Sequence, residues 1–257
     1  MQRPRFRMLR LRRFVLGLVL MVPVVLLQAD EYDDFLSEEE LFGDFEEETV
    51  FAVSDPFEPV NRVTFKLNDF LYVKVMQPIS NGYQKVTPDP VERGASNFFT
   101  NLGYPVRLVG NLLQLELKGA WLETERFAVN TTLGIVGVRK AADQFERLQP
   151  RQPEDVGLAF GSWGIGEGPY LVLPLIGPSN CRDLVGLVGD RAVNPLRSPY
   201  SVFDDYRWQF AYDATEVTVR SPGLLRVYTQ MKEGSIDPYS AMKNGYAQRR
   251  RSMIEGD

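Results

Sequence analysis

The sequence contains no histidine among its 257 residues. Histidine is the most common general base near neutral pH, and it completes the Ser-His-Asp and Cys-His arrangements of nucleophilic catalysis. It is also one of the usual ligands of zinc. Its absence therefore excludes the most common hydrolases and zinc sites, and we expect a protein that is not an enzyme, with no metal and no cofactor.

Cysteine and long apolar runs are nearly as scarce. Cys181 is the only cysteine, so the chain forms no internal disulfide, and without a histidine to activate it we interpret Cys181 as a structural thiol. From residue 30 onward no apolar run reaches 18 residues. This excludes ordinary membrane-spanning helices, but it leaves helices that lie in a membrane interface.

The first 29 residues have the three parts of a secretory signal. Six arginines and no acidic residue are joined to an apolar run from Phe14 to Leu27, and Ala29 stands at the break before Asp30. A spanning helix needs about 20 apolar residues, so this run is short for one. We therefore predict a signal peptide over residues 1–29. An uncleaved N-terminal anchor is the alternative.

Charge divides the rest of the chain into two parts. Residues 30–48 hold eleven acidic side chains and no basic one, whereas the remaining 209 residues hold 23 of each sign. Like charges repel one another, so we predict an acidic disordered segment over residues 30–54. The neutral remainder lacks the basic face that nucleic-acid binding requires. It shows no repeat or linker, which predicts one domain over residues 55–246 and a basic tail over residues 247–257.

Prolines and apolar spacing predict a mainly α domain. Asp55 and Pro56 form a helix start, and the helix that follows is predicted to end before Pro78. Asp89 and Pro105 begin two further helices, and others are expected over residues 119–133, 155–163 and 179–188. Residues 170–176 are interpreted as a short strand or an extended stretch, where Pro174 argues against a central strand.

Asparagine and arginine recur within these apolar helices. Asparagine is a mediocre helix former and needs hydrogen-bond partners when it is buried. As a group these side chains could line a polar passage, whereas each one alone is better explained by helix capping or by contacts in the core. They are Asn61, Asn68, Asn97, Asn101, Asn111 and Asn130, with Arg62, Arg107 and Arg126.

Several ordered motifs resemble those of the MlaA (VacJ) family. The first is Asp55-Pro-Phe-Glu-Pro-Val-Asn61-Arg62, and the longest begins at Glu154 and runs through Trp163. The motifs occur in the same order as in the family from about residue 55 to residue 200, and Asp237-Pro-Tyr is a further, weaker match. The other matching stretches are residues 97–102, 126–134, 168–174 and 177–183.

The resemblance implies an outer-membrane lipoprotein, built as a compact single-domain ring of amphipathic helices in the inner leaflet. Phospholipids misplaced in the outer leaflet would leave through a polar channel for a soluble periplasmic carrier, with trimeric porins as partners and no chemical reaction. The residues expected to line or support this lipid passage are Asn61, Arg62, Asn97, Asn101, Arg126 and Asn130. The motif residues left without a role are Trp163, Pro174, Arg182 and Asp183.

The sequence departs from the family pattern in two places. A bacterial lipoprotein needs a cysteine just after its signal, and here the stretch from Leu26 to Asp30 has none. The protein is then released soluble on the periplasmic side, held by its apolar helices, or held by an uncleaved signal. Near Gly137 the family tends to carry an acid, whereas Arg139 and Lys140 stand here, so the charge of any channel differs at that point.

Two other classes of protein remain open. One is a periplasmic protein that binds a hydrophobic ligand, and the other is a structural envelope protein without a ligand. Lipid that copurifies with the protein would separate the structural class from the others, and membrane fractionation would separate transport from soluble binding.

We expect the exported protein to begin near Asp30 and to lack a lipid anchor, because Ala29 stands at the break and no cysteine follows the apolar run. The intact mass of the exported protein tests this expectation. A mass that includes residues 1–29, or an added diacylglycerol, would contradict it.

Overall fold

The computed structural model describes residues 53–197 and 205–255. The predicted signal peptide and nearly all of the predicted acidic segment lie outside these residues. The described part is mainly α with one two-stranded sheet, as the sequence predicts.

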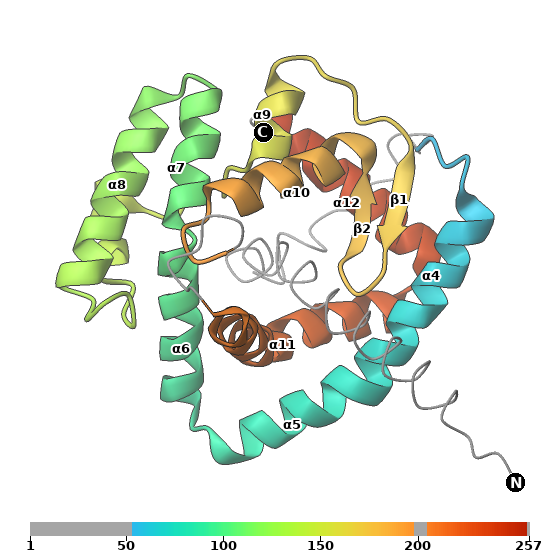
Figure 1. Ribbon diagram of the computed structural model, residues 1–257, viewed down its shortest axis with the longest axis horizontal. Helices are drawn as coiled ribbons and strands as arrows, with labels where there is room; N and C mark the ends of the chain where they lie inside the picture. The colour runs from blue at the N-terminus through green and yellow to red at the C-terminus, as the bar shows by residue number, and fades with distance from the viewer. Residues whose placement is uncertain (1–52, 198–204, 256–257) are drawn as a thin grey trace, which may run out of the picture.

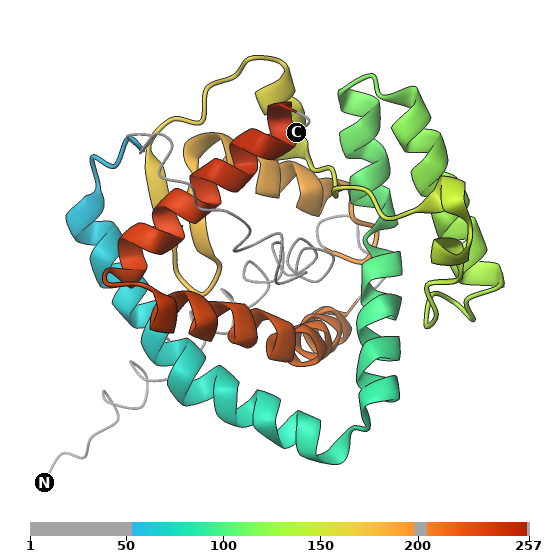
Figure 2. The same ribbon diagram turned by 180° about the vertical axis from the view of Figure 1, so that it is seen from behind.

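The helices and the β-hairpin follow one another around a ring (Figure 1). In chain order the elements are α4 (Glu58–Leu71), the π-helical η1 (Tyr72–Met76), α5 (Gln77–Val86), α6 (Asp89–Leu102), α7 (Tyr104–Leu113), α8 (Leu117–Thr132), the 3-10 turns η2 (Ala141–Gln144) and η3 (Glu146–Leu148), α9 (Val156–Ser162), β1 (Tyr170–Leu173), β2 (Gly177–Asn180), α10 (Cys181–Val193), α11 (Tyr206–Gly234) and α12 (Pro238–Glu255). α8 lies outside α6 and α7, whereas α11 packs along α5 and α12 crosses the hairpin on one face of the ring (Figure 2).

Local sequence signals locate most of the helix starts. α6 begins at Asp89 and α7 at Tyr104, each with a proline in its first turn. Proline is accepted there because the first N–H groups of a helix have no intrahelical partner. The side chains of Asp155 and Asn180 accept hydrogen bonds from backbone N–H groups in the first turns of α9 and α10.

The predicted end of the first helix before Pro78 is wrong. α4 continues into η1, at whose end the N–H of Gln77 donates to the carbonyl of Tyr72, one residue further back than in an α-helix. A new α-helical register begins there. Pro78 consequently falls in the first turn of α5, where its missing N–H leaves no hydrogen bond unmade.

The two C-terminal helices have no counterpart among the predicted elements. α11 spans 29 residues and contains Pro222, and α12 continues to Glu255. Residues 247–255 therefore extend a helix instead of starting a separate basic tail. Arg250 of this stretch is 3% exposed, which makes it part of the interior of the protein.

The ring closes where α4 meets the free edge of β1. The side-chain amide of Asn61 donates to the carbonyl of Tyr170 at 3.0 Å and accepts from the N–H of Val172 at 2.9 Å. Asn68 repeats the pattern with the carbonyl of Leu173 at 2.9 Å and the N–H of Leu175 at 2.6 Å. We call these four hydrogen bonds the asparagine seam. They give the strand edge the partners that a third strand would supply.

Helical and extended geometry make the seam possible. Asn61 and Asn68 are seven residues apart on a helix, a rise of about 10.5 Å. Tyr170 and Leu173 are three residues apart on a strand, a rise of about 10 Å. The two rises match, so each amide meets the same pair of backbone groups at its own level of the strand.

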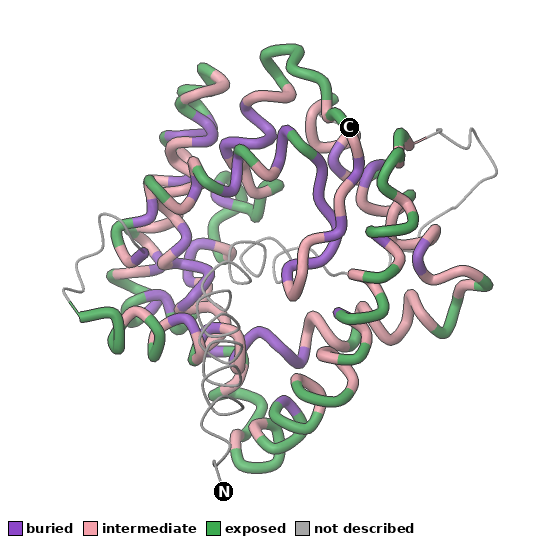
Figure 3. The backbone as a smooth tube through the Cα atoms, turned by 45° about the vertical axis from the view of Figure 1, so that its right-hand side comes forward, coloured by how far each residue is buried: buried purple, intermediate pink, exposed green. Residues whose placement is uncertain are grey.

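The seam turns the apolar face of α4 outward. Asn61 is 2% exposed, whereas Val60 and Val63 on the neighbouring face are 65% and 68% exposed. Leu67 and Phe70 continue the exposed apolar face along the helix. Figure 3 shows buried and exposed positions alternating along the helices of the ring. The helix is therefore amphipathic, but its polar side faces the interior of the protein and its apolar side faces outward.

A small aromatic cluster lies behind the seam. Tyr170, Val172 and Tyr239 are buried together, with Phe65 packed against them. The rings of Tyr170 and Tyr239 meet edge to face at 6.2 Å, and those of Phe65 and Tyr239 at 5.9 Å. This cluster joins α4, β1 and α12, so the closing point of the ring is also part of its core.

We expect Asn68→Ala to lower the free energy of unfolding by about 1–3 kcal/mol, because two backbone groups of the hairpin lose their partner. Asn81→Ala is the matched control, since Asn81 is exposed on α5 and its loss should change stability by less than about 0.5 kcal/mol. Urea denaturation measures both. Equal effects of the two substitutions would contradict the role given to the seam.

Candidate functional site

The six residues expected at the lipid passage fall into two groups. Asn61 and Arg62 lie on α4 beside the seam and α12. The other four border one small pocket between α6 and α8, on the outer side of the ring, and they are Asn97, Asn101, Arg126 and Asn130. The structure therefore brings four of the six together and does not join them to the first two.

Three of the four residues hold the connection between α8 and α9 in place, and Asn101 joins α6 to α8. Asn97 donates to the carbonyl of Val138 at 3.1 Å, and Asn101 donates to the hydroxyl of Thr131 at 3.0 Å. Asn130 accepts from the N–H of Ala142 at 2.8 Å. Each of these three amides thus ties a loop or a neighbouring helix to the ring.

Arg62 and Arg126 both pair with acidic residues of the protein, but neither pairs with Asp69 or Glu123. Arg126 donates to Asp143 at 2.9 Å and also binds the carbonyl of Leu148. Glu123 instead accepts from Arg107 at 2.9 Å.

Arg62 pairs with Asp237 at the start of α12, at 2.8 Å, and with Glu58 at 2.7 Å. Its guanidinium also lies 4.3 Å from the ring centre of Tyr239. The hydrogen bonds from Arg62 and Ser240 hold the pKa of Asp237 well below its ordinary value. Arg62 is thus one of several α4 contacts with the C-terminal helices.

The C-terminal helices bind the body of the ring through a repeated pattern. Residues 228–250, which we call the C-terminal strap, contain three tyrosines, each followed four residues later by a lysine or arginine. Residues four apart share a helix face, and each pair binds one aspartate of the ring. The pairs are Tyr228 and Lys232 with Asp69, Tyr239 and Lys243 with Asp55, and Tyr246 and Arg250 with Asp183.

The third of these contacts is the most buried. The carboxylate of Asp183 accepts from Tyr246 at 2.5 Å and from Arg250 at 2.9 Å. Arg250 also donates to Asp155 at 2.5 Å, and Asp155 caps α9. Burial alone would raise the pKa of Asp183, but Arg250, Arg182 and Tyr246 outweigh it and hold the pKa below its ordinary value.

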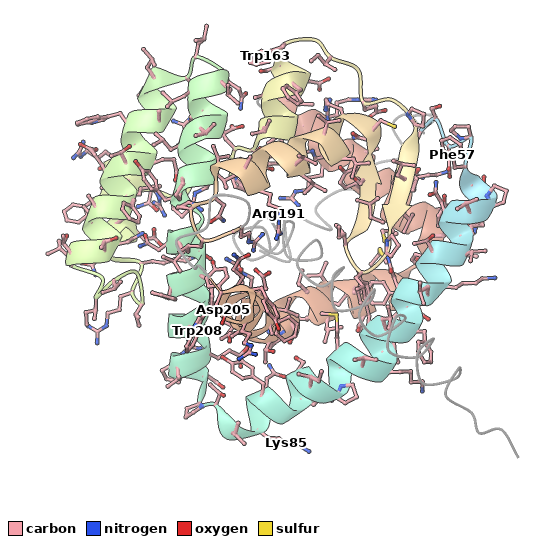
Figure 4. All side chains as sticks on the ribbon, in the orientation of Figure 1. Phe57, Lys85, Trp163, Arg191, Asp205 and Trp208 are labelled. Atoms are coloured by element: carbon pink, nitrogen blue, oxygen red, sulfur yellow. The ribbon has the colours of Figure 1, made fainter. Side chains whose placement is uncertain are left out.

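This network accounts for two of the motif residues without an assigned role, because Asp183 and Arg182 are both buried in it. Pro174 begins the turn between β1 and β2, as its lack of an N–H requires, and Leu175 next to it has a φ of 69°. Trp163 lies at the end of α9, where its indole donates to the carbonyl of Leu113 at 2.9 Å (Figure 4).

A second charged cluster, which sequence reasoning missed, lies on α11. Arg197 donates to Glu216 at 2.7 Å, and Arg220 approaches the same carboxylate at 3.4 Å. Asp213 lies 3.7 Å from Arg197, and burial raises its pKa. The spacing of residues 213, 216 and 220 puts all three on one helix face, and that spacing is the signal that could have identified them.

Charged side chains also occur on the inner side of the ring. Arg191 points from α10 toward the middle of the ring (Figure 4), and burial lowers its pKa. A cavity of about 50 Å³ lies between α7, α9, α10 and α12, bordered by Asp183, Asp190 and Arg250 among others. A volume of this size can accommodate water molecules and is too small for a lipid.

No part of this arrangement has the form of a metal site or a transmembrane helix. Within residues 53–197 and 205–255, no group of three or more histidine, cysteine, aspartate or glutamate side chains is placed to hold a metal ion. Across the same residues, every helix is too short or too polar to cross a membrane.

The polarity of the ring is inverted relative to an ordinary soluble domain. Its buried side chains include many charged and amide groups, and large apolar side chains are exposed on its outer helices. From α4 to α8 these are Val60, Val63, Leu67, Phe70, Val75, Ile79, Val86, Val91, Leu112, Leu115, Leu117 and Trp121. Fold and site together define a class: a helical ring with a polar interior and an apolar circumference.

Comparison with known proteins agrees with this class. The chain belongs to the MlaA lipoprotein family, whose sequence profile matches residues 53–253. The MlaA proteins of the intermembrane phospholipid transport system from Shigella flexneri and Escherichia coli K12 are 32% and 31% identical to this chain, over 79% of each chain. An uncharacterized protein of Rickettsia prowazekii is 31% identical over 83% of each chain.

A solved structure, reported as the structural basis for maintenance of bacterial outer membrane lipid asymmetry, matches with a TM-score of 0.65 and 28% identity. The match covers 78% of this chain and 99% of the solved one. The family resemblance seen in the sequence is thereby confirmed, as is the helical fold expected from it.

We expect Tyr246→Phe to lower the free energy of unfolding by about 1–2 kcal/mol at neutral pH, because the buried Asp183 loses a hydrogen-bond donor. The pKa of Asp183 is lowered in the folded protein. The stabilisation that ionised Asp183 gives the folded protein is therefore fully present above the pKa of an aspartate in the unfolded chain, near 4. It is lost as the pH falls through the lower pKa of Asp183 in the folded protein. The difference between wild type and variant should shrink in acid.

Tyr206→Phe is the control, since the side chain of Tyr206 is exposed. Denaturation at a series of pH values measures all three proteins. A difference between wild type and Tyr246→Phe that is as large in acid, where both proteins lose stability, as it is at neutral pH would contradict the assignment.

Proposed function

We propose that this protein takes part in phospholipid transport between the two membranes of the bacterial envelope. In this role it removes misplaced phospholipid from the outer leaflet of the outer membrane and passes it to a soluble periplasmic carrier. The MlaA relatives named for the intermembrane phospholipid transport system support this proposal, because this chain spans about four fifths of their length. No chemical reaction is part of the proposal.

The observation that carries the proposal is the inverted polarity of the ring. Burying a large apolar side chain in hydrocarbon contributes about 1.5–3 kcal/mol, so the exposed apolar side chains of α4 favour a membrane around the ring. A phospholipid headgroup is charged and hydrated, and moving it costs several kcal/mol unless polar groups replace its water. Charged side chains such as Arg191 supply such groups on the inner side.

We place the protein at the outer membrane on its periplasmic side, held by its apolar circumference. Trimeric porins and a periplasmic lipid carrier are the partners that this role requires. A periplasmic protein that binds a hydrophobic ligand is the alternative. The apolar circumference favours the membrane-bound protein over that alternative, because in a soluble protein it would face water.

The asparagines and arginines of the family motifs support the passage in this proposal more than they line it. Asn61 closes the ring, and Asn101 and Arg126 hold the wall formed by α6 and α8. Their polar groups are already engaged by the protein, so they are not available to a passing headgroup. Substitution of Asn101 or Arg126 would therefore reduce the abundance of the protein together with transfer.

We expect Val63→Glu combined with Leu67→Glu to move the protein from the membrane to the soluble fraction, because two acidic side chains replace apolar ones on the outer face of α4. Val63→Leu combined with Leu67→Val keeps that face apolar and should stay in the membrane. Fractionation at low and high salt measures both. Recovery of all the wild-type protein in the soluble fraction at both low and high salt would contradict the proposed location.

Deletion of the gene tests the transport itself. Surface-exposed phospholipid, measured by its accessibility to external phospholipase, should rise in the deletion strain. The wild-type protein and the Val63→Leu, Leu67→Val variant should reverse the rise, whereas the Val63→Glu, Leu67→Glu variant should not. An unchanged outer leaflet, with purified protein that carries no phospholipid in native mass spectrometry, would leave a structural envelope protein as the better interpretation.

A further inference from the structure

Large apolar residues occupy left-handed backbone positions at both ends of α8. Leu115, in the turn before the helix, has a φ of 61°, and Ile135 and Val136, in the turn after it, have φ angles of 56° and 58°. Glycine and asparagine adopt this conformation at little cost, whereas leucine, isoleucine and valine are strained in it. The same chain places glycine at other left-handed positions, such as Gly137 and Gly168.

Contacts within the protein do not explain these three apolar side chains. Leu115, Ile135 and Val136 are 82%, 59% and 55% exposed. Leu175 is also left-handed, but it is only partly exposed and its N–H donates to the side chain of Asn68. Strained residues of this kind are found mainly where they serve a function. The apolar side chains beside α8 are therefore available to a partner outside the chain.

We propose that the two turns are insertion points, which place their apolar side chains among the acyl chains of a phospholipid leaflet. α8 lies outside α6 and α7, so both turns are on the outer edge of the ring (Figures 1 and 2). The 16 residues of α8 separate the two turns by about 24 Å. The inference rests on the proposed membrane location, and it adds which part of the ring penetrates the leaflet.

The turn before α8 is held by its backbone. The N–H of Leu115 donates to the carbonyl of Leu112 at 3.1 Å, and the N–H of Glu116 donates to the carbonyl of Asn111 at 2.9 Å. Gly119 lets α8 begin close to α7, because a side chain at this position would overlap the amide of Asn111. None of these contacts uses the side chain of Leu115. Asparagine would fit the turn with less strain.

The turn after α8 is held in the same way. The N–H of Val136 donates to the carbonyl of Thr131, and the N–H of Arg139 donates to the carbonyl of Gly134, both at 2.8 Å. The side chains of Ile135 and Val136 take no part in these hydrogen bonds. In both turns, the backbone thus fixes the conformation and leaves the apolar side chains outside.

The outer face of α8 extends the apolar surface from the first turn. Leu117 and Trp121 are four residues apart and share a helix face, and they are 69% and 63% exposed. Glu123, on the opposite side of the helix, is buried. The acid next to Leu117 is Glu116, which lies 3.5 Å from Arg151 in an ion pair. Its charge is therefore balanced beside the apolar surface.

Basic side chains next to both turns favour a phospholipid over a protein as the partner. Lys118 follows Leu117, Arg139 follows Val138, and both basic residues are exposed. Long basic side chains can lay their alkyl stems along an apolar surface while their charged ends reach the headgroups. An aromatic residue such as Trp121 prefers the same boundary. The turns thus combine the apolar and cationic groups that suit the region where acyl chains meet headgroups.

Fluorescent labels test the position of the turns in the membrane. Cys181 is the only cysteine, so in a Cys181→Ser background Leu115→Cys or Ile135→Cys carries a single label. The detergent-purified full chain is placed in vesicles of phosphatidylethanolamine and phosphatidylglycerol. Phospholipid with a nitroxide on its acyl chain should quench both labels about twofold more than a label at Ile236→Cys. Ile236 is fully exposed, but it lies in the turn between α11 and α12, across the ring from α8 (Figure 2).

Substitutions separate membrane insertion from folding. Leu115→Asn, and Ile135→Asn combined with Val136→Gly, remove apolar side chains and introduce residues that accept a left-handed backbone. Each variant should bind the same vesicles on the order of tenfold more weakly, because apolar side chains no longer enter the leaflet. In detergent each should resist urea at least as well as wild type. The control Ile236→Asn should weaken binding less than about twofold, since a single exposed apolar residue elsewhere needs no partner.

Two results would overturn the inference and leave the membrane location intact. One is vesicle binding by Leu115→Asn that equals that of wild type. The other is equal quenching of all three labels, or a label at position 115 that only a water-soluble quencher reaches, which would favour a protein partner.

Two further outcomes decide the remaining cases. Lower resistance to urea in both turn variants would show that these side chains pack within the protein, and would also overturn the inference. Failure of the wild-type protein to bind vesicles would contradict the membrane location together with the inference, so the two failures are distinguishable.

Discussion

Two asparagine side chains close this ring, and the rest of the structure depends on them. Asn61 and Asn68 bind the backbone of β1, which would otherwise be left with an open edge in a two-stranded sheet. The amides point inward, whereas Val60, Val63, Leu67 and Phe70 on other faces of the same helix point outward. One set of contacts between α4 and β1 therefore determines both the closure of the ring and the outward orientation of these apolar side chains of α4.

Polar pairing replaces much of the apolar core that a soluble domain of this length would bury. Buried charges are costly unless they are paired and hydrogen-bonded, and here the C-terminal strap supplies a phenol and a cation for each of three aspartates. Asp183 shows the result, since its pKa is lowered in spite of its burial. The ring is thus stabilised by matched polar groups inside while its apolar side chains remain free to meet hydrocarbon.

Features that depend on neighbouring residues could be predicted from the sequence, and features that depend on distant ones could not. Asp89 with Pro90, and Pro105, identified the starts of α6 and α7, because a helix start is decided within one turn. The helix of α4, η1 and α5 continues through Pro78 because of a π-helical shift of register, which the spacing of apolar residues does not predict. α11 and α12 were missed because they bind charged and aromatic groups on several sides and have no single apolar face. The motif asparagines were found by resemblance, but their division into two groups is set by contacts more than a hundred residues apart, such as that of Asn61 with Tyr170.

The C-terminal strap also fixes the order in which the molecule can assemble. Asp55 is bound by Tyr239 and Lys243 of α12. One of the first described residues therefore gains its partners only when the last helix has formed. During synthesis, α4 is made long before α12. Its apolar face is then exposed, and its carboxylates do not yet have the partners that α12 supplies. Such a chain is prone to aggregate until synthesis ends. The first turns of α12 therefore complete the pairing of Asp55, so the polar contacts that close the ring form only after nearly all of the described chain has been made.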